Sequence, residues 1–123
     1  MDLRLPLGLD IQDVAGKISA ALAPAGFRLV DTYQQAGHYV DPNSELVQKL
    51  LAVYAARTGE EAAKPLAIGG GTYARCIPNA VAFGCERPGL DNRIHQVNEF
   101  IPLDNLLDDA CMLADAILAL ACE

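Results

Sequence analysis

The sequence predicts an α/β fold, and three observations lead to this prediction. Segments with helical periodicity alternate along the chain with short apolar runs, which is typical of helices packed on a sheet. Apolar residues make up 52% of the 123 residues and charged residues 20%, so the chain can form a packed core and lacks the composition of a disordered protein. No low-complexity tract or internal repeat interrupts this pattern. We therefore expect strands that are at least partly parallel in the second segment of the chain.

The first segment has the pattern of a strand, a helix and a second strand. Residues 3–7 form the first expected strand, and Asp10 lies where the N-cap of a helix belongs. Pro24 and Gly26 should end that helix, and residues 27–33 form the second expected strand. The apolar side chains of the helix recur at helical spacing: Ile11, Val14, Ile18, Ala21 and Leu22.

A polar connection at residues 34–42 separates this segment from the rest of the chain. It contains Gly37 and Pro42, and the character of the sequence changes after it. Linkers of this composition are common at domain boundaries. We predict that residues 1–37 and 38–123 belong to different domains whose strands do not join one sheet.

The second segment should contain a helix and two short strands before its last helix. Asn43 or Ser44 caps the first of these helices, and Gly59 lies where a left-handed C-terminal residue is expected. The strands are expected at residues 66–68 and 80–83. The helix has one apolar stripe: Leu46, Val47, Leu50, Leu51 and Tyr54.

The last expected helix covers residues 104–121. Asp104, Asp108 and Asp115 form its narrow polar stripe. Because the rest of its circumference is apolar, the helix must pack against a sheet or another helix. The apolar arc consists of Leu106, Leu107, Ala110, Leu113, Ala114, Ile117, Leu118 and Ala121.

Charge and hydropathy exclude several kinds of partner. The net charge is −7 and the nine Lys and Arg residues are scattered, whereas nucleic-acid-binding proteins concentrate basic residues on one face. We therefore expect no nucleic-acid partner. The sequence has no apolar run long enough to span a membrane and no signal-peptide pattern. We expect a soluble cytoplasmic protein without a membrane partner.

Four cysteines occur at spacings that fit neither a zinc knuckle nor a redox pair. The simplest interpretation is four reduced thiols, since free cysteine is often buried, with Cys122 exposed near the end of the sequence. Nucleophilic catalysis by Cys76 or Cys85 with His95 is an alternative. It requires a proximity that the sequence does not show.

The sequence GGGTYAR, from Gly69 to Arg75, is the most specific local feature. Consecutive glycines indicate either a main chain that approaches a ligand closely or a backbone with positive φ. A tight turn is the simpler alternative. The lysine and spacing of a phosphate-binding P-loop are missing.

Histidine occurs twice, at His38 and His95. A lone histidine is usually structural or solvent-exposed, and a zinc ion needs at least three protein ligands. No suitable ligands lie nearby in the sequence of either residue. By itself, neither histidine therefore predicts a metal site.

Four segments together are more specific than any one of them. In order along the chain they are DLRLP at residues 2–6, HYVDPNSELVQKLLAVYAARTG at 38–59, PLAIGGGTYARCIPNAVAFG at 65–84 and HQVNEFIPLDNLL at 95–107. Their order and their amino-acid sequences resemble the C-terminal quarter of the dinuclear zinc dipeptidases of the aminoacylase and carboxypeptidase-G-like metallopeptidase family. The resemblance is strongest to the Xaa-dipeptidase, carnosinase-like branch.

The resemblance implies a specific organisation. Residues 1–37 would be the last strand, helix and strand of an inserted lid domain, and residues 38–123 the C-terminal part of the catalytic domain. Arg4 matches the lid arginine that holds the C-terminal carboxylate of a dipeptide, and His95 matches a ligand of one of two zinc ions. The loop that lines the substrate-carboxylate pocket matches Gly69, Gly70, Gly71 and Thr72.

The resemblance also implies that chemistry is incomplete in this chain. The family's HxD zinc pair, bridging aspartate, general-base glutamate and lid histidine have no match here. We therefore expect the C-terminal portion of a zinc dipeptidase of short unblocked peptides, inactive alone. Either a homo-oligomer or pairing with a missing N-terminal half is expected. The alternative is a non-catalytic α/β module that binds a peptide or amino-acid carboxylate.

Overall fold

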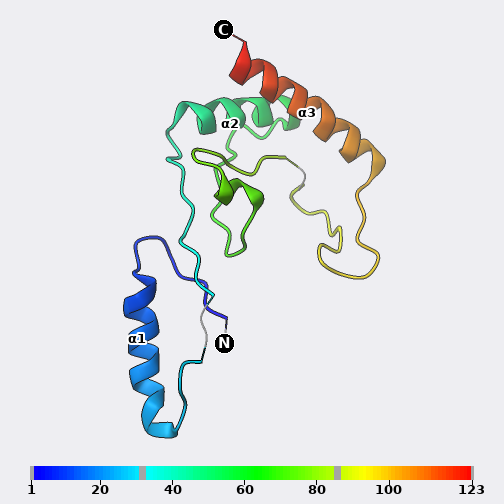
Figure 1. Ribbon diagram of the computed structural model, residues 1–123. Helices are drawn as coiled ribbons and strands as arrows, with labels where there is room; N and C mark the ends of the chain where they lie inside the picture. The colour runs from blue at the N-terminus through cyan, green and yellow to red at the C-terminus, as the bar shows by residue number, and fades with distance from the viewer. Residues whose placement is uncertain (1, 31–32, 85–86, 123) are drawn as a thin grey trace. The chain divides into compact units, whose positions relative to one another are not determined.

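The structure is a computed structural model that describes residues 2–30, 33–84 and 87–122 (Figure 1). Its helical elements fall into two compact units. One unit comprises Met1–Tyr39 and Ile68–Pro78, and the other Val40–Ala67 and Asn79–Glu123; we call them unit 1 and unit 2. The elements in chain order are α1 (Ile11–Leu22), η1 (Ala23–Ala25), α2 (Glu45–Thr58), η2 (Tyr73–Cys76) and α3 (Leu103–Ala121).

The prediction of an α/β fold is wrong, because no strand occurs in the described ranges. The expected strands at 3–7, 66–68 and 80–83 are turns or irregular backbone, and so is the described part of 27–33. Residues 31 and 32 lie outside the described residues. A strand forms only where a neighbour completes its ladder of hydrogen bonds. Short apolar runs show that a segment suits a sheet, but they do not supply that neighbour. The boundary at residues 37 and 38 stays a prediction.

Helix α1 in unit 1 begins where the sequence predicts. The Asp10 carboxylate accepts hydrogen bonds from the backbone N–H groups of Gln12 and Asp13, and an ion pair between Lys17 and Asp13 spans one turn at 2.7 Å. The following η1 ends at Gly26, whose φ of 81° suits glycine. No residue of α1 is fully buried.

Helix α2 in unit 2 also has both predicted ends. The Ser44 hydroxyl accepts from the N–H of Val47 at 3.4 Å, and Gly59 has a φ of 76° with its N–H bonded to the carbonyl of Ala55. The predicted apolar stripe is buried or half-buried throughout. The sequence therefore determines both the bounds of α2 and the face that packs.

Helix α3 lies beside α2 and forms the core of unit 2 with it (Figure 1). The face of α3 toward α2 carries Met112, 1% exposed, together with Asp109 and Ala116, while α2 contributes Val47 and Leu50. The expectation that this helix packs on a sheet or another helix is therefore confirmed. The stripe that packs contains an aspartate, and most of the apolar arc is exposed.

An ion pair lies within this core. Asp109 is 4% exposed, and its Oδ1 lies 2.7 Å from Arg87 Nη2. Among the described residues, both Asp109 oxygens and Arg87 Nη1 are buried without a hydrogen-bond partner. The ion pair therefore joins Arg87 to α3.

A second, exposed ion pair connects the same two helices. Arg57 Nε on α2 donates to Asp115 Oδ2 on α3 at 2.6 Å, and the two side chains are 38% and 41% exposed. None of the helices in the described ranges is both long and apolar enough to cross a membrane.

Candidate functional site

Two of the predicted binding elements meet in unit 1. Arg4 Nη1 donates a hydrogen bond of 3.0 Å to the carbonyl oxygen of Gly69, although the two residues are 65 positions apart in the chain. The resemblance assigns both residues to recognition of a substrate carboxylate. This contact therefore joins the predicted arginine to the predicted glycine loop.

Arg4 already holds a carboxylate in this structure. Both Nε and Nη2 of Arg4 donate to the same oxygen of Asp2, at 3.1 and 2.7 Å. These hydrogen bonds and the charge of Arg4 lower the pKa of Asp2, and Asp2 in turn raises the pKa of Arg4. Both side chains are exposed, so the guanidinium is open to exchange Asp2 for another carboxylate.

We expect the Arg4→Gln substitution to raise the pKa of Asp2 toward its ordinary value of 3.8. Because the pKa of Asp2 is lowered, the ion pair contributes to the stability of the folded state at a pH above the ordinary pKa. That contribution is lost as the pH falls through the lowered pKa. A carbon-detected NMR titration of the Asp2 carboxyl measures this change. Asp115 is the control, because Arg57 lowers its pKa and Arg4→Gln should leave it unchanged. An unaltered Asp2 midpoint would contradict the pairing.

One of the three glycines in the loop lies close to a side chain. None of Gly69, Gly70 and Gly71 has a positive φ, so of the two alternatives for consecutive glycines the positive φ is not found. A Cβ at Gly71 would lie 2.5 Å from Arg75 Nη1, whereas nothing lies within 4 Å of a Cβ at Gly69 or Gly70. Gly71 therefore lets the Arg75 guanidinium lie close to the main chain.

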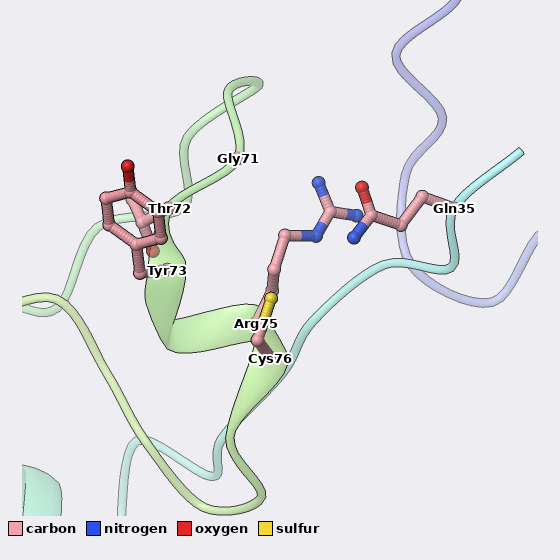
Figure 2. A pocket seen from close by; sticks show the side chains of 6 residues that line it. All are labelled: Gln35, Gly71, Thr72, Tyr73, Arg75 and Cys76. Carbon is pink, nitrogen blue, oxygen red and sulfur yellow. The ribbon is translucent and has the colours of Figure 1, made fainter. Parts of the chain in front are cut away.

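Arg75 is the functional candidate that the sequence interpretation missed. Its Nη2 donates to the carbonyl of Ala36 at 2.8 Å, which fixes the side chain across unit 1. Figure 2 shows the guanidinium reaching the side chain of Gln35, while Thr72 and Tyr73 extend to another side of η2. The arginine was visible at the end of GGGTYAR, but nothing in the sequence placed it beside residues 35 and 36.

An open cavity of about 450 Å³ lies at this loop. Its lining includes Arg75 and Gln35, and also Thr72 and Tyr73, whose side chains extend to another side of η2. Such groups can orient a small polar ligand, and a guanidinium favours a carboxylate. The full lining is Gln35, Gly71, Thr72, Tyr73, Arg75 and Cys76.

His95 lies in unit 2, in an exposed loop that is closed by its own hydrogen bonds. The Phe100 N–H donates to the Asn92 carbonyl at 3.1 Å, and the His95 N–H donates to Glu99 Oε2 at 3.2 Å. His95 has a φ of 61°, and Arg93 and Asn98 have similar values. Left-handed residues other than glycine are uncommon, so the loop has a specific conformation that presents His95 at a turn.

The described residues do not form a zinc site by themselves. They contain no group of three His, Cys, Asp or Glu residues placed to hold a metal ion, and a zinc site requires at least three protein ligands. Cys76 is exposed and belongs to unit 1, whereas His95 belongs to unit 2. Cys85 lies outside the described residues.

Comparisons with known proteins cover the whole chain. It is 35% identical over 123 residues to a protein of Staphylococcus epidermidis named "Putative dipeptidase". It is 33% identical over 123 residues to proteins named in the same way from Staphylococcus aureus strains USA300 and NCTC 8325. No family model matches, and no solved structure matches. Each match covers 100% of this chain and 26% of the relative, so the chain is similar along its entire length to one quarter of proteins named as dipeptidases.

Proposed function

We propose that this chain is a portion of a zinc-dependent dipeptidase that hydrolyses short unblocked peptides, and that it binds the substrate carboxylate without sufficing for hydrolysis. The observation that carries this proposal is the identity of 33% and 35% over all 123 residues to proteins named as dipeptidases. Identity spread over the full chain indicates common descent of the whole segment. The relatives are about four times as long as their match to this chain, and the remaining length would supply the rest of the site.

The geometry of unit 1 fits the binding role. Arg4 holds Asp2 through two donors of its planar guanidinium and donates a third hydrogen bond to Gly69. A guanidinium matches a carboxylate better than an ammonium does, because its donors are fixed in one plane. In this proposal the C-terminal carboxylate of a dipeptide would take the place of the Asp2 carboxylate, which is exposed.

The other proposed roles concern the chemistry of the complete enzyme. Two zinc ions would activate water and stabilise negative charge when bound. Within this chain His95 would contribute one ligand, and its loop would fix the position of the imidazole. Gly70 and Thr72 would line the carboxylate pocket with Gly69 and Gly71. The residues of this chain would bind and orient the peptide, and a general base would come from elsewhere.

We expect Arg4→Lys to weaken binding of alanyl-alanine to the chain about tenfold, because two coplanar charged hydrogen bonds are lost. Two-dimensional NMR titration of the Gly69 and Gly71 amides measures the affinity. The C-terminal amide of the same dipeptide should bind more weakly than the free acid to the natural chain. That preference should disappear in the Arg4→Lys variant.

Arg28→Lys is the matched control, since Arg28 is an exposed arginine of the same unit. It should leave the affinity and the preference for the free acid unchanged. Equal affinity of the natural chain for the free acid and the amide would refute carboxylate recognition by this site. Equal effects of the two substitutions would show that the loss of affinity is not specific to Arg4.

A further inference from the structure

Helix α3 carries apolar side chains on two different faces. One face packs on α2 through Asp109, Met112 and Ala116. The residues that follow these around the helix are also apolar, and they are exposed. The exposed large side chains of the helix are Leu103, Leu106, Leu107, Leu113, Ile117, Leu118 and Leu120. We call this set the outer face of α3.

The outer face is wide and contains no charge. At 100° per residue, its side chains span about 160° of the circumference, from beside the α2-facing stripe to the opposite side of the helix. Ala110, Ala114 and Ala121 lie between them and are also exposed. The exposed aspartates, Asp104 and Asp108, occupy the sector that remains. A helix with so little polar circumference is normally buried on nearly all sides, and soluble proteins rarely expose apolar patches of this extent.

We propose that the outer face of α3 is the docking surface for the polypeptide that corresponds to the unmatched three quarters of the dipeptidase relatives. The chain covers 26% of each relative, so in a protein of that length this helix has a large neighbouring body of polypeptide. The inference rests on the proposed function, because it takes the dipeptidase relatives as the guide to the partner.

The other possible occupants fit the helix less well. Helices that lie on membranes carry Lys and Arg on their polar face, whereas α3 has four aspartates and no basic residue. A second copy of the chain would bring together two proteins of net charge −7 each, which opposes association through mutual repulsion.

The test measures binding of the 123-residue chain to the complementary polypeptide, defined as the Staphylococcus epidermidis relative without its matched quarter. The complementary polypeptide is first shown to bind the relative's own matched quarter, and only such a preparation is used in the test. We expect a one-to-one complex with this chain, measured by calorimetry and sedimentation. Ile117→Glu should weaken it by at least roughly 30-fold, the effect of losing a central interface residue.

Ala52→Glu is the matched control, because it adds the same charge at an exposed position of α2. Ile117 is 65% exposed, so Ile117→Glu should keep the helical circular dichroism of the natural chain, and Leu106→Glu provides a second variant of the same face. Failure of the natural chain to bind would overturn the proposal. Equal weakening of the complex by Ala52→Glu would also overturn it. The same holds if the chain forms a homodimer that Ile117→Glu dissociates but that the complementary polypeptide does not displace. Binding is measured without a peptide substrate, so a failure of docking is distinct from a failure of hydrolysis.

Discussion

Arg87→Ala should lower the free energy of unfolding of unit 2 by about 3–5 kcal/mol, the cost of removing one partner of a buried ion pair. Asp109 is 4% exposed on the face of α3 that packs on α2, and Arg87 is its counter-ion at 2.7 Å. Without Arg87 the carboxylate would stay buried without a counter-ion or break the helix contact to reach water. Urea denaturation followed by circular dichroism at 222 nm measures the loss of stability. In the extreme case the variant would be unfolded without urea.

Two further variants separate charge burial from general damage. The double variant Arg87→Leu with Asp109→Leu should recover most of the stability, because an apolar pair of similar size often replaces a buried ion pair without loss. Arg57→Ala breaks the pair with Asp115, whose side chain is 41% exposed, and should cost much less than Arg87→Ala, because exposed ion pairs contribute little to stability. Equal losses for Arg87→Ala and Arg57→Ala would contradict the importance of burial.

The helices were predictable from the sequence because their signals are local. Asp10, Ser44 and Gly59 determine helix ends through contacts within a few residues. Strands depend on a partner distant in the sequence, and the apolar runs at 66–68 and 80–83 have none in the described ranges. The burial of Asp109 was equally invisible, since hydropathy alone does not show which stripe of α3 packs on α2.

The sequence identified the candidate residues that the resemblance covers. It did not identify residues that reach the candidate site only through the fold of the chain. Arg4 and Gly69 were named separately, and the structure brings them together. Arg75 was passed over because its place beside Gln35 depends on how the chain returns to unit 1. The roles of Arg4, the three glycines, Thr72 and His95 stay predictions, and so does the zinc pair.

His95→Ala should abolish most of the activity of an enzyme that contains this chain. The suitable protein is a chimera in which the 123 residues replace the matched quarter of the Staphylococcus epidermidis relative. Loss of a group that only supports a zinc ligand costs about 10–100-fold, so loss of the ligand itself should lower kcat/KM by more than about 100-fold. Zinc content by metal analysis should fall in the same variant.

Gln96→Ala is the matched control for this loop. Gln96 is exposed, and it holds the loop through its backbone N–H, which donates to the Arg93 carbonyl at 2.8 Å. The substitution keeps that hydrogen bond and should leave zinc content and turnover close to those of the unsubstituted chimera. An equal loss in the two variants would indicate a disturbed loop and not a missing ligand.

The most direct measurement of the central claim is the steady-state hydrolysis of alanyl-alanine by the 123-residue chain alone and by the chimera. Our account predicts no turnover and only weak zinc binding by the chain alone, because His95 is the single ligand that the resemblance assigns to it. It predicts zinc-dependent turnover by the chimera that requires His95. Turnover by the chain alone, or a folded and zinc-loaded chimera that hydrolyses no dipeptide, would contradict the account.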